Sequence, residues 1–184
     1  CFFIDGSGEF ISGDFITALL AQAFLLKQPG ATIIYDLRAS FAVRDLVSAH
    51  GGRALMNRVG HSYIKRRMRD TSAVFGGEVT GHYYFRDNHF ADNGMIPAPL
   101  ILELMSKQGK TLHELLAPLR EKYFISGEIN TKVASMDLVQ GKLDLIAKKH
   151  ADGTQSTLDR CPTRITRPSA SSSTAANPAT TSPR

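Results

Sequence analysis

Residues 32–77 read TIIYDLRASFAVRDLVSAHGGRALMNRVGHSYIKRRMRDTSAVFGG, and their pattern decides the fold class. Apolar runs near 31–36, 53–58 and 73–76 alternate with two segments in which apolar residues recur at helical spacing. Strand–helix–strand order with such short connections is typical of a parallel sheet covered by helices. We therefore expect an α/β domain in which these three strands are parallel. Their carboxyl ends should share one edge of the sheet, where ligands bind in such folds.

The flanking segments extend this domain on both sides. Residues 2–11 predict a short hairpin, and a helix follows it, for which Ser12 or Asp14 supplies the cap. Pro97 fits the first turn of a later helix, and residues 111–114 match a capping box at the start of another. The predicted fold is a three-layer domain with a mixed, mainly parallel sheet between helices.

Changes in composition predict where the domains end. The charged run 120–122 marks a boundary, and after it residues 123–129 predict a strand and residues 136–149 a helix, as at the start of an α+β domain. Of the last 24 residues, 18 are Pro, Ser, Thr or Ala, which predicts a disordered or frame-shifted tail. The predicted divisions are residues 1–11, 12–119, 120–160 and 161–184.

Composition and charge exclude several classes of protein. No apolar run among the 184 residues approaches the roughly 20 that a membrane-spanning helix needs. Cys1 and Cys161 lie too far apart in sequence for a disulfide framework or a cysteine metal cluster, so we expect a reducing, cytoplasmic setting. The net charge of +5 includes three arginines in the tail, and residues 1–160 carry 19 basic and 17 acidic side chains. Such a balance does not favour nucleic acid or a membrane surface as the partner.

Residues 76–82, Gly-Gly-Glu-Val-Thr-Gly-His, directly follow the third apolar run. Glycines let the backbone approach a ligand closely, while Glu, Thr and His side chains hydrogen-bond hydroxyl groups. A carboxylate that accepts from two neighbouring hydroxyls suits a polyol. A glycine-rich turn with incidental polar residues is the alternative, and the position at the ligand edge of the sheet favours binding.

Two further loops should reach the same edge. Arg38 follows the first core strand, and Arg58 and His61 follow the second. His61 also stands at a helix start, where backbone amides favour anions such as phosphate. The basic residues of 65–69 are interpreted as a solvated helix face.

These loops resemble those of the phosphomannomutase/phosphoglucomutase branch of the α-D-phosphohexomutases. The resemblance rests on residues 77–82, on 59–61 with 64–65, and on 12–14, and it extends from Cys1 to about Asp159. It implies an intramolecular phosphotransferase, an isomerase that interconverts hexose 1-phosphate and hexose 6-phosphate. The family works through a hexose 1,6-bisphosphate intermediate and an active-site phosphoserine with Mg²⁺.

The resemblance also implies roles for individual residues. Glu78 and Thr80 would bind the ring hydroxyls of the sugar. His61 and Arg38 would contact sugar or phosphate, and His82 would assist proton transfer or binding. The candidate catalytic residues are thus His61, His82 and Arg38. The candidate substrate-binding residues are Arg38, His61, Gly77, Glu78, Thr80 and Gly81.

Parts of the family pattern are absent from the sequence. The phosphoserine loop and the Asp-Gly-Asp-Gly-Asp-Arg magnesium loop do not occur, and the latter would end immediately before Cys1. The phosphate-binding loop of the fourth domain does not occur after Cys161. We therefore expect the interior of a longer protein, namely a complete third domain with the end of the second and a broken fourth. Such a chain should supply sugar recognition without turnover of its own, and its magnesium ligands should lie elsewhere.

Three alternatives remain open at this point. A sugar-phosphate-binding module without catalysis fits the same loop. A phosphoglucosamine mutase is disfavoured by Val79, where those enzymes usually carry Gln. A nucleic-acid-binding protein would use residues 65–69 and the basic tail, and its binding would depend steeply on salt. The oligomeric state is left open.

Overall fold

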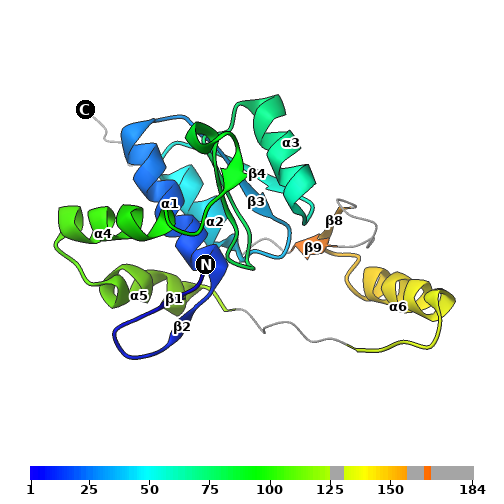
Figure 1. Cartoon of the computed structure of the whole chain (residues 1–184). Coiled ribbons are helices and arrows are strands. Elements are labelled where there is room, and N and C mark those ends of the chain that lie inside the picture. The colour runs from blue at the N-terminus through cyan, green and yellow to red at the C-terminus, as the bar shows by residue number, and fades with distance from the viewer. Residues whose placement is uncertain (125–130, 157–163, 167–184) are drawn as a thin grey trace, which may run out of the picture. The chain divides into compact units, whose positions relative to one another are not determined.

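The computed structural model describes residues 1–124, 131–156 and 164–166. The chain divides into two units, Cys1–Lys132 and Val133–Arg184 (Figure 1). The first unit holds every candidate site residue, with His61 in a helix, Gly77 in a strand and the others in the loops between elements. Within the described ranges, no helix combines the length and apolarity that a bilayer crossing requires.

A five-stranded mixed sheet forms the centre of the first unit. Strand β3 (Thr32–Asp36) pairs in parallel with β4 (Arg53–Asn57) on one side and with β5 (Phe75–Gly77) on the other. Strands β6 (Tyr83–Phe85) and β7 (Ala91–Asp92) extend the sheet beyond β5 in antiparallel pairing. The prediction of three mutually parallel core strands is therefore confirmed.

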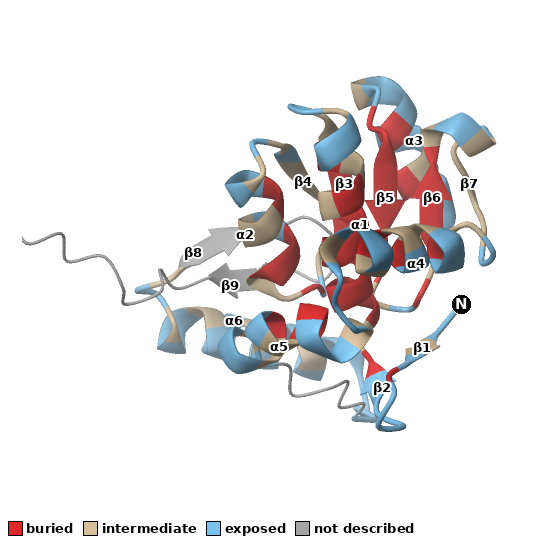
Figure 2. Ribbon diagram, turned by 90° about the vertical axis from the view of Figure 1, so that its left-hand side faces the viewer, coloured by how far each residue is buried: buried red, intermediate tan, exposed pale blue. Residues whose placement is uncertain are grey.

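Helices cover both faces of this sheet. Alternate residues of β3 separate the two sides, because Ile33 and Tyr35 belong to one buried cluster and Ile34 to another. The larger cluster joins the sheet to four helices. In the smaller cluster, Ile64 and Met68 of a fifth helix pack against the opposite face of the sheet. Figure 2 shows the buried strands β3, β5 and β6 with α1 and α4 on one side and α3 on the other. The helices of the larger side are α1 (Gly13–Lys27), α2 (Phe41–Ala49), α4 (Pro97–Gln108) and α5 (Leu112–Lys122), and α3 (His61–Thr71) covers the other side.

Helix starts follow the sequence except at α1. Ser40 caps α2 by accepting from the Ala42 N–H, Thr111 forms the predicted capping box at α5, and Pro97 occupies the first position of α4. The predicted side-chain cap of α1 is wrong, because neither Ser12 nor Asp14 bonds to a free amide of that helix. The buried Asp14 carboxylate instead accepts from the Ser12 hydroxyl and from the N–H and hydroxyl of Ser40. It links the starts of α1 and α2.

Strand β5 ends with two glycines, Gly76 within the predicted third strand and Gly77 one residue beyond it. A Cβ on Gly76 would lie 3.0 Å from the Met68 sulfur in α3, and a Cβ on Gly77 would collide with Thr17 in α1. Helices on both faces therefore approach β5 closely because it lacks side chains there. The turn glycine of this region is Gly81, whose φ is +77°.

Replacing Gly77 with alanine should destabilise the first unit. The added methyl group must displace Thr17, and overpacking of a tight core costs about 1–3 kcal/mol. Gly6→Ala is the matched control, since a Cβ at Gly6 would meet no atom within 4 Å. The check is urea denaturation of both variants, with Thr17→Ala added to Gly77→Ala to recover part of the loss. Equal stability of Gly77→Ala and Gly6→Ala would contradict this packing.

The remaining elements complete the comparison with the sequence. Strands β1 (Phe3–Ile4) and β2 (Phe10–Ile11) form the predicted antiparallel hairpin, and the 3₁₀ helix η1 (Arg86–Asn88) lies between β6 and β7. Helix α5 passes Pro118 and ends at Lys122, within the predicted boundary segment 120–122. Most of the strand predicted at 123–129 lies outside the described residues.

The second unit contains the predicted helix and a small strand pair. Helix α6 spans Met136–Lys149, as expected. Strand β8 (Thr154–Ser156) pairs antiparallel with β9 (Arg164–Thr166). The sequence predicts a disordered or frame-shifted tail over 161–184, and within it the structure describes the three residues of β9. The rest of 161–184 lies outside the described residues.

Candidate functional site

Three connections meet at the carboxyl-terminal edge of the parallel strands. In the sheet register, Asp36 of β3 lies opposite Asn57 of β4, and Tyr35 lies opposite Gly77 of β5. The loops that follow these strands therefore begin side by side. They carry Arg38, His61 and residues 78–82, so the structure brings the three predicted loops to one edge.

Residues 78–82 form a tight turn that is held from both sides. The Glu78 N–H donates to the His82 carbonyl over 2.9 Å, and the Gly81 N–H donates to the Glu78 carbonyl over 3.0 Å. The first residue of α1, Gly13, packs so closely that a Cβ there would collide with the Val79 carbonyl. The start of α1 thus fixes the shape of the loop, which gives Ser12-Gly13-Asp14 a structural role in the site.

The Glu78 carboxylate is buried at the start of α3. The residue is 3% exposed, and its Oε1 accepts from the Gly60 N–H over 3.1 Å while its Oε2 accepts from the Thr80 hydroxyl over 3.2 Å. Gly60 precedes the first turn of α3, where the helix dipole favours negative charge. An ionised carboxylate has about four acceptor sites, so these two bonds leave capacity for ligand hydroxyls.

Asp36, the last residue of β3, holds the loops after β3 and β5 together. Its carboxylate has no exposed surface, and it accepts from the Arg38 N–H over 2.7 Å and from the Val79 N–H over 2.9 Å. The Arg38 guanidinium also pairs with it over 3.0 Å. The sequence analysis assigned no role to Asp36. An acidic residue at the end of a buried strand was the available signal, because a buried carboxylate requires partners.

Asp92 joins the two candidate histidines. Its Oδ2 lies 3.0 Å from His82 Nδ1 and its Oδ1 lies 3.7 Å from His61 Nδ1, while the two imidazole rings are 4.4 Å apart between centroids. Burial acts to raise the pKa of Asp92, but the His82 hydrogen bond and the charges of His61, His82 and Lys65 outweigh it and lower that pKa. The sequence analysis missed Asp92, since nothing in its pattern placed β7 beside β6.

Tyr84 and Lys65 complete the surroundings of this edge. Tyr84 is fully buried, and its ring meets the His61 ring edge-on at 5.4 Å between centroids. Burial, together with the charges of Glu78, Asp92 and Asp36, raises the pKa of its hydroxyl. Lys65 Nζ lies 5.9 Å from the Tyr84 ring centroid, so Lys65 belongs to the site. The neighbouring Arg66, Arg67 and Arg69 are exposed, as a solvated helix face requires.

Gly77 and Arg58 lie apart from these contacts, as do His50 and His89, two histidines that are not candidates for the site. Gly77 is buried in β5. His50 bonds the Leu46 carbonyl, as expected of a residue at a helix end. His89 adopts a left-handed backbone conformation after η1. The Arg58 guanidinium stacks 3.8 Å from the Tyr63 ring centroid.

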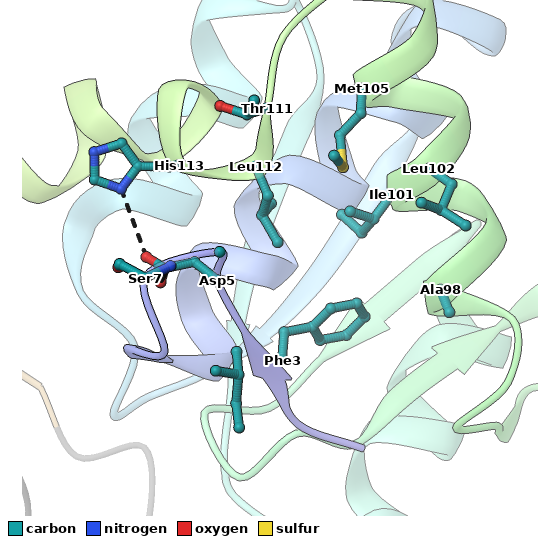
Figure 3. A pocket seen from close by; sticks show the side chains of 12 residues that line it. Phe3, Asp5, Ser7, Ala98, Ile101, Leu102, Met105, Thr111, Leu112 and His113 are labelled. Atoms are coloured by element: carbon teal, nitrogen blue, oxygen red, sulfur yellow. Dashed lines mark hydrogen bonds and ion pairs between the residues drawn. The ribbon is translucent and has the colours of Figure 1, made fainter.

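A cavity of about 750 Å³ opens elsewhere in the first unit (Figure 3). Apolar side chains from β1, α4 and α5 line most of it, among them Phe3, Ile101 and Leu112. One ion pair, between His113 and Asp5 over 3.6 Å, adjoins it. None of the candidate site residues lines this cavity, and its apolar walls do not suit a sugar phosphate.

Comparison with known proteins identifies the domain. The family model described as phosphoglucomutase/phosphomannomutase, alpha/beta/alpha domain III, matches residues 12–123. A phosphomannomutase of Escherichia coli K12 is 48% identical over 134 residues, which are 73% of this chain and 29% of that protein. A protein named phosphohexose mutases from Xanthomonas campestris is 45% identical and is matched over 72% of this chain and 30% of its own length.

Solved structures agree with these relatives. A phosphoglucomutase/phosphomannomutase family protein from Burkholderia thailandensis superposes with a TM-score of 0.68 at 28% identity, over 91% of this chain and 35% of that one. N-acetylphosphoglucosamine mutase of Aspergillus fumigatus, solved with glucose 1,6-bisphosphate, shares the fold at 16% identity and a TM-score of 0.51, over 84% of this chain and 39% of that one. The chain spans about 29% of the length of the phosphomannomutase that it matches. Since the family model covers more than half of its residues, the chain belongs to the phosphoglucomutase/phosphomannomutase family and carries the family's alpha/beta/alpha domain III.

Proposed function

We propose that this domain is the sugar-recognition part of a phosphohexomutase and binds hexose 1-phosphate and hexose 6-phosphate at the strand-end edge. The observation that carries the proposal is the Glu78 carboxylate, which is buried, held by Gly60 and Thr80, and retains acceptor capacity. The Thr80 hydroxyl beside it is both a donor and an acceptor. Together these two side chains suit a pair of neighbouring ring hydroxyls.

The phosphate group of the substrate suits the cationic side of the edge. Arg38 and Lys65 provide fixed positive charge, and His61 occupies the first position of α3, where backbone amides and the dipole favour anions. Charge-assisted hydrogen bonds of this kind contribute about 1.5–3 kcal/mol each. The complex of the Aspergillus mutase with glucose 1,6-bisphosphate is consistent with a bisphosphate as a ligand of this fold.

His82 is the proposed proton carrier. When Nδ1 donates to Asp92, the other ring nitrogen, Nε2, is left as the acceptor. At that atom the imidazole could take the proton of a sugar hydroxyl as the hydroxyl attacks a phosphoryl group, and return a proton to the leaving oxygen. Asp92 would hold the imidazole in the orientation and tautomer that this step needs.

Magnesium does not fit the described residues of this chain. Among them, one group of three potential metal ligands lies close together, namely His61, His82 and Asp92. Mg²⁺ prefers oxygen ligands in octahedral geometry, and two of these three ligands are imidazole nitrogens. We therefore assign the Mg²⁺ and the phosphoserine of the proposed reaction to other parts of the mutase. The domain divisions at 11, 119 and 160 and the cytoplasmic location remain predictions.

Exchange of domains tests the proposed function. Residues 12–123 replace the matching segment of the Escherichia coli phosphomannomutase, and conversion of mannose 1-phosphate is measured with Mg²⁺ and a bisphosphate activator. We expect turnover by the chimera and none by residues 1–184 alone, because phosphoryl transfer depends on a donor and a cation that the domain does not supply. A chimera that folds, as judged by its cooperative melting, yet lacks turnover would contradict the proposal. Turnover by residues 1–184 alone would show that the catalytic groups are misplaced.

A further inference from the structure

We propose that His61, His82 and Asp92 together form a binding site for one divalent transition-metal ion, of which Zn²⁺ is the best-suited example. The three side chains come from the start of α3, from the turn before β6 and from β7. They are therefore assembled by the tertiary fold. This ion is distinct from the magnesium of the proposed reaction, which the same residues do not fit.

The three ligand atoms lie near one another but are more widely spaced than in a bound zinc site. Each residue offers one ligand atom, and the three atoms lie within 4.8 Å of one another. A tetrahedral Zn²⁺ with bonds of 2.0–2.2 Å holds its ligand atoms roughly 3.3–3.5 Å apart. Asp92 Oδ2 lies 3.0 Å from His82 Nδ1, at hydrogen-bond distance, while the other oxygen, Oδ1, lies 3.7 Å from His61 Nδ1. Binding of one ion would therefore require the imidazole rings to turn until one atom from each residue reaches that spacing.

The ligand chemistry selects transition metals. Imidazole suits Zn²⁺, Cu²⁺ and Ni²⁺, and a carboxylate adds negative charge without favouring Mg²⁺ in a set rich in nitrogen. Three protein ligands leave a fourth position for water or an anion. The side chains of His61, His82 and Asp92 are 44%, 41% and 32% exposed, so an ion can reach them from solvent.

Charges of both signs surround the cluster. Asp92 supplies one negative charge within it, and the Glu78 carboxylate at the start of α3 supplies a second nearby. Lys65 and the amino-terminal end of α3 oppose a cation. Arg38 is paired with Asp36, and the Glu78 carboxylate accepts from the Gly60 N–H at the helix start, which offsets the dipole there. Removing the charge of Lys65 should therefore tighten metal binding.

Occupation of the cluster would compete with substrate. A bound metal ion would engage the two imidazoles that the proposed function assigns to phosphate binding and proton transfer. This consequence rests on the proposed function, whereas the metal site itself does not. Metal binding is therefore measured without sugar phosphate. A negative result then counts against the metal site alone and leaves the proposed function untouched.

Titration of the 184-residue chain with Co²⁺ and Zn²⁺ tests the site. The parent chain carries Cys1→Ser and Cys161→Ser, because the exposed Cys1 lies next to the site and a thiolate would itself bind these metals. We expect one equivalent of Co²⁺ to produce the visible absorption of a tetrahedral complex, and one equivalent of Zn²⁺ to abolish it. Mg²⁺ in large excess should leave the absorption unchanged.

Substitutions then assign the ligands. His61→Ala, His82→Ala and Asp92→Asn should each weaken Zn²⁺ binding at least about tenfold, as loss even of an outer-shell partner typically does. His113→Ala removes a histidine that also faces a carboxylate, Asp5, but has no second histidine, and it should leave the affinity unchanged. Lys65→Gln should tighten Zn²⁺ binding, because it removes a positive charge beside the cluster. Melting of each variant confirms that it is folded. Equal Zn²⁺ affinity in the parent chain and in folded His82→Ala, or an equal loss in His113→Ala, would overturn the proposal.

Discussion

Replacing Glu78 with alanine in a complete mutase that carries this domain should lower kcat/KM for hexose phosphate roughly 10²- to 10⁴-fold. The carboxylate would accept from two sugar hydroxyls, and such charge-assisted hydrogen bonds contribute about 1.5–3 kcal/mol each. Glu78→Gln retains the shape and one acceptor oxygen, so its loss should be smaller. Steady-state kinetics with glucose 1-phosphate and mannose 1-phosphate measure both effects.

A control separates binding from folding in this experiment. Glu78 also accepts from the Gly60 N–H, so its removal leaves a backbone donor without that partner. Each variant is therefore assayed well below its melting temperature. Glu103→Ala is the matched carboxylate control, since Glu103 pairs with Lys27 and Lys107 away from the site. Full activity of Glu78→Ala would show that the role assigned to this loop is wrong.

Replacing Asp36 with alanine should destabilise the domain by about 3 kcal/mol, toward the lower end of the cost of breaking a buried ion pair. The carboxylate is fully buried, and its removal deprives the Val79 and Arg38 amides and the Arg38 guanidinium of their shared acceptor. Arg38 is 32% exposed and can reach water, which limits the cost. Urea denaturation measures the change in the free energy of unfolding.

Replacing Asp36 should also loosen the loop of residues 78–82, in addition to lowering the global stability. Without Asp36, the Val79 amide loses its partner, and its hydrogen exchange should speed up more than that of the central residues of β3. Asp70→Ala, which removes an exposed pair with Arg66, should cost about 1 kcal/mol or less. A change within about 0.5 kcal/mol of zero for Asp36→Ala, as is usual for a surface substitution, would contradict its role as the organiser of this edge.

The sheet and its functional edge could be predicted because their signals are local. Apolar runs and helical spacing are periodic in sequence, and parallel connection fixes which loops share an edge. The sequence alone therefore assigns Arg38, His61, Glu78, Thr80 and His82 to the right edge. The family resemblance adds their roles, which remain proposals.

The missed features depend on contacts between residues far apart in sequence. Position 77 needs glycine because Thr17, sixty positions earlier in the chain, occupies the space where a Cβ would lie. No local sequence pattern reveals such a contact between a helix and a strand. Strand β7 has two residues, too few for any periodicity, so Asp92 could not be placed beside the histidines. Asp14 resembles a helix cap in sequence because an aspartate can either cap a helix or, as here, accept hydrogen bonds from Ser12 and Ser40 while buried.

Titration of the isotopically labelled chain with glucose 1-phosphate, followed through the backbone amide resonances, tests whether this edge of the sheet recognises the sugar. We expect concentration-dependent shifts at Gly60, His61 and residues 78–82, with none at Phe3, Ile101 or Leu112 around the apolar cavity. The shifts at the loop should be absent from folded Glu78→Ala at the same ligand concentration. Shifts confined to the cavity residues, or identical shifts in the parent chain and in Glu78→Ala, would contradict the assignment of sugar recognition to this edge of the sheet.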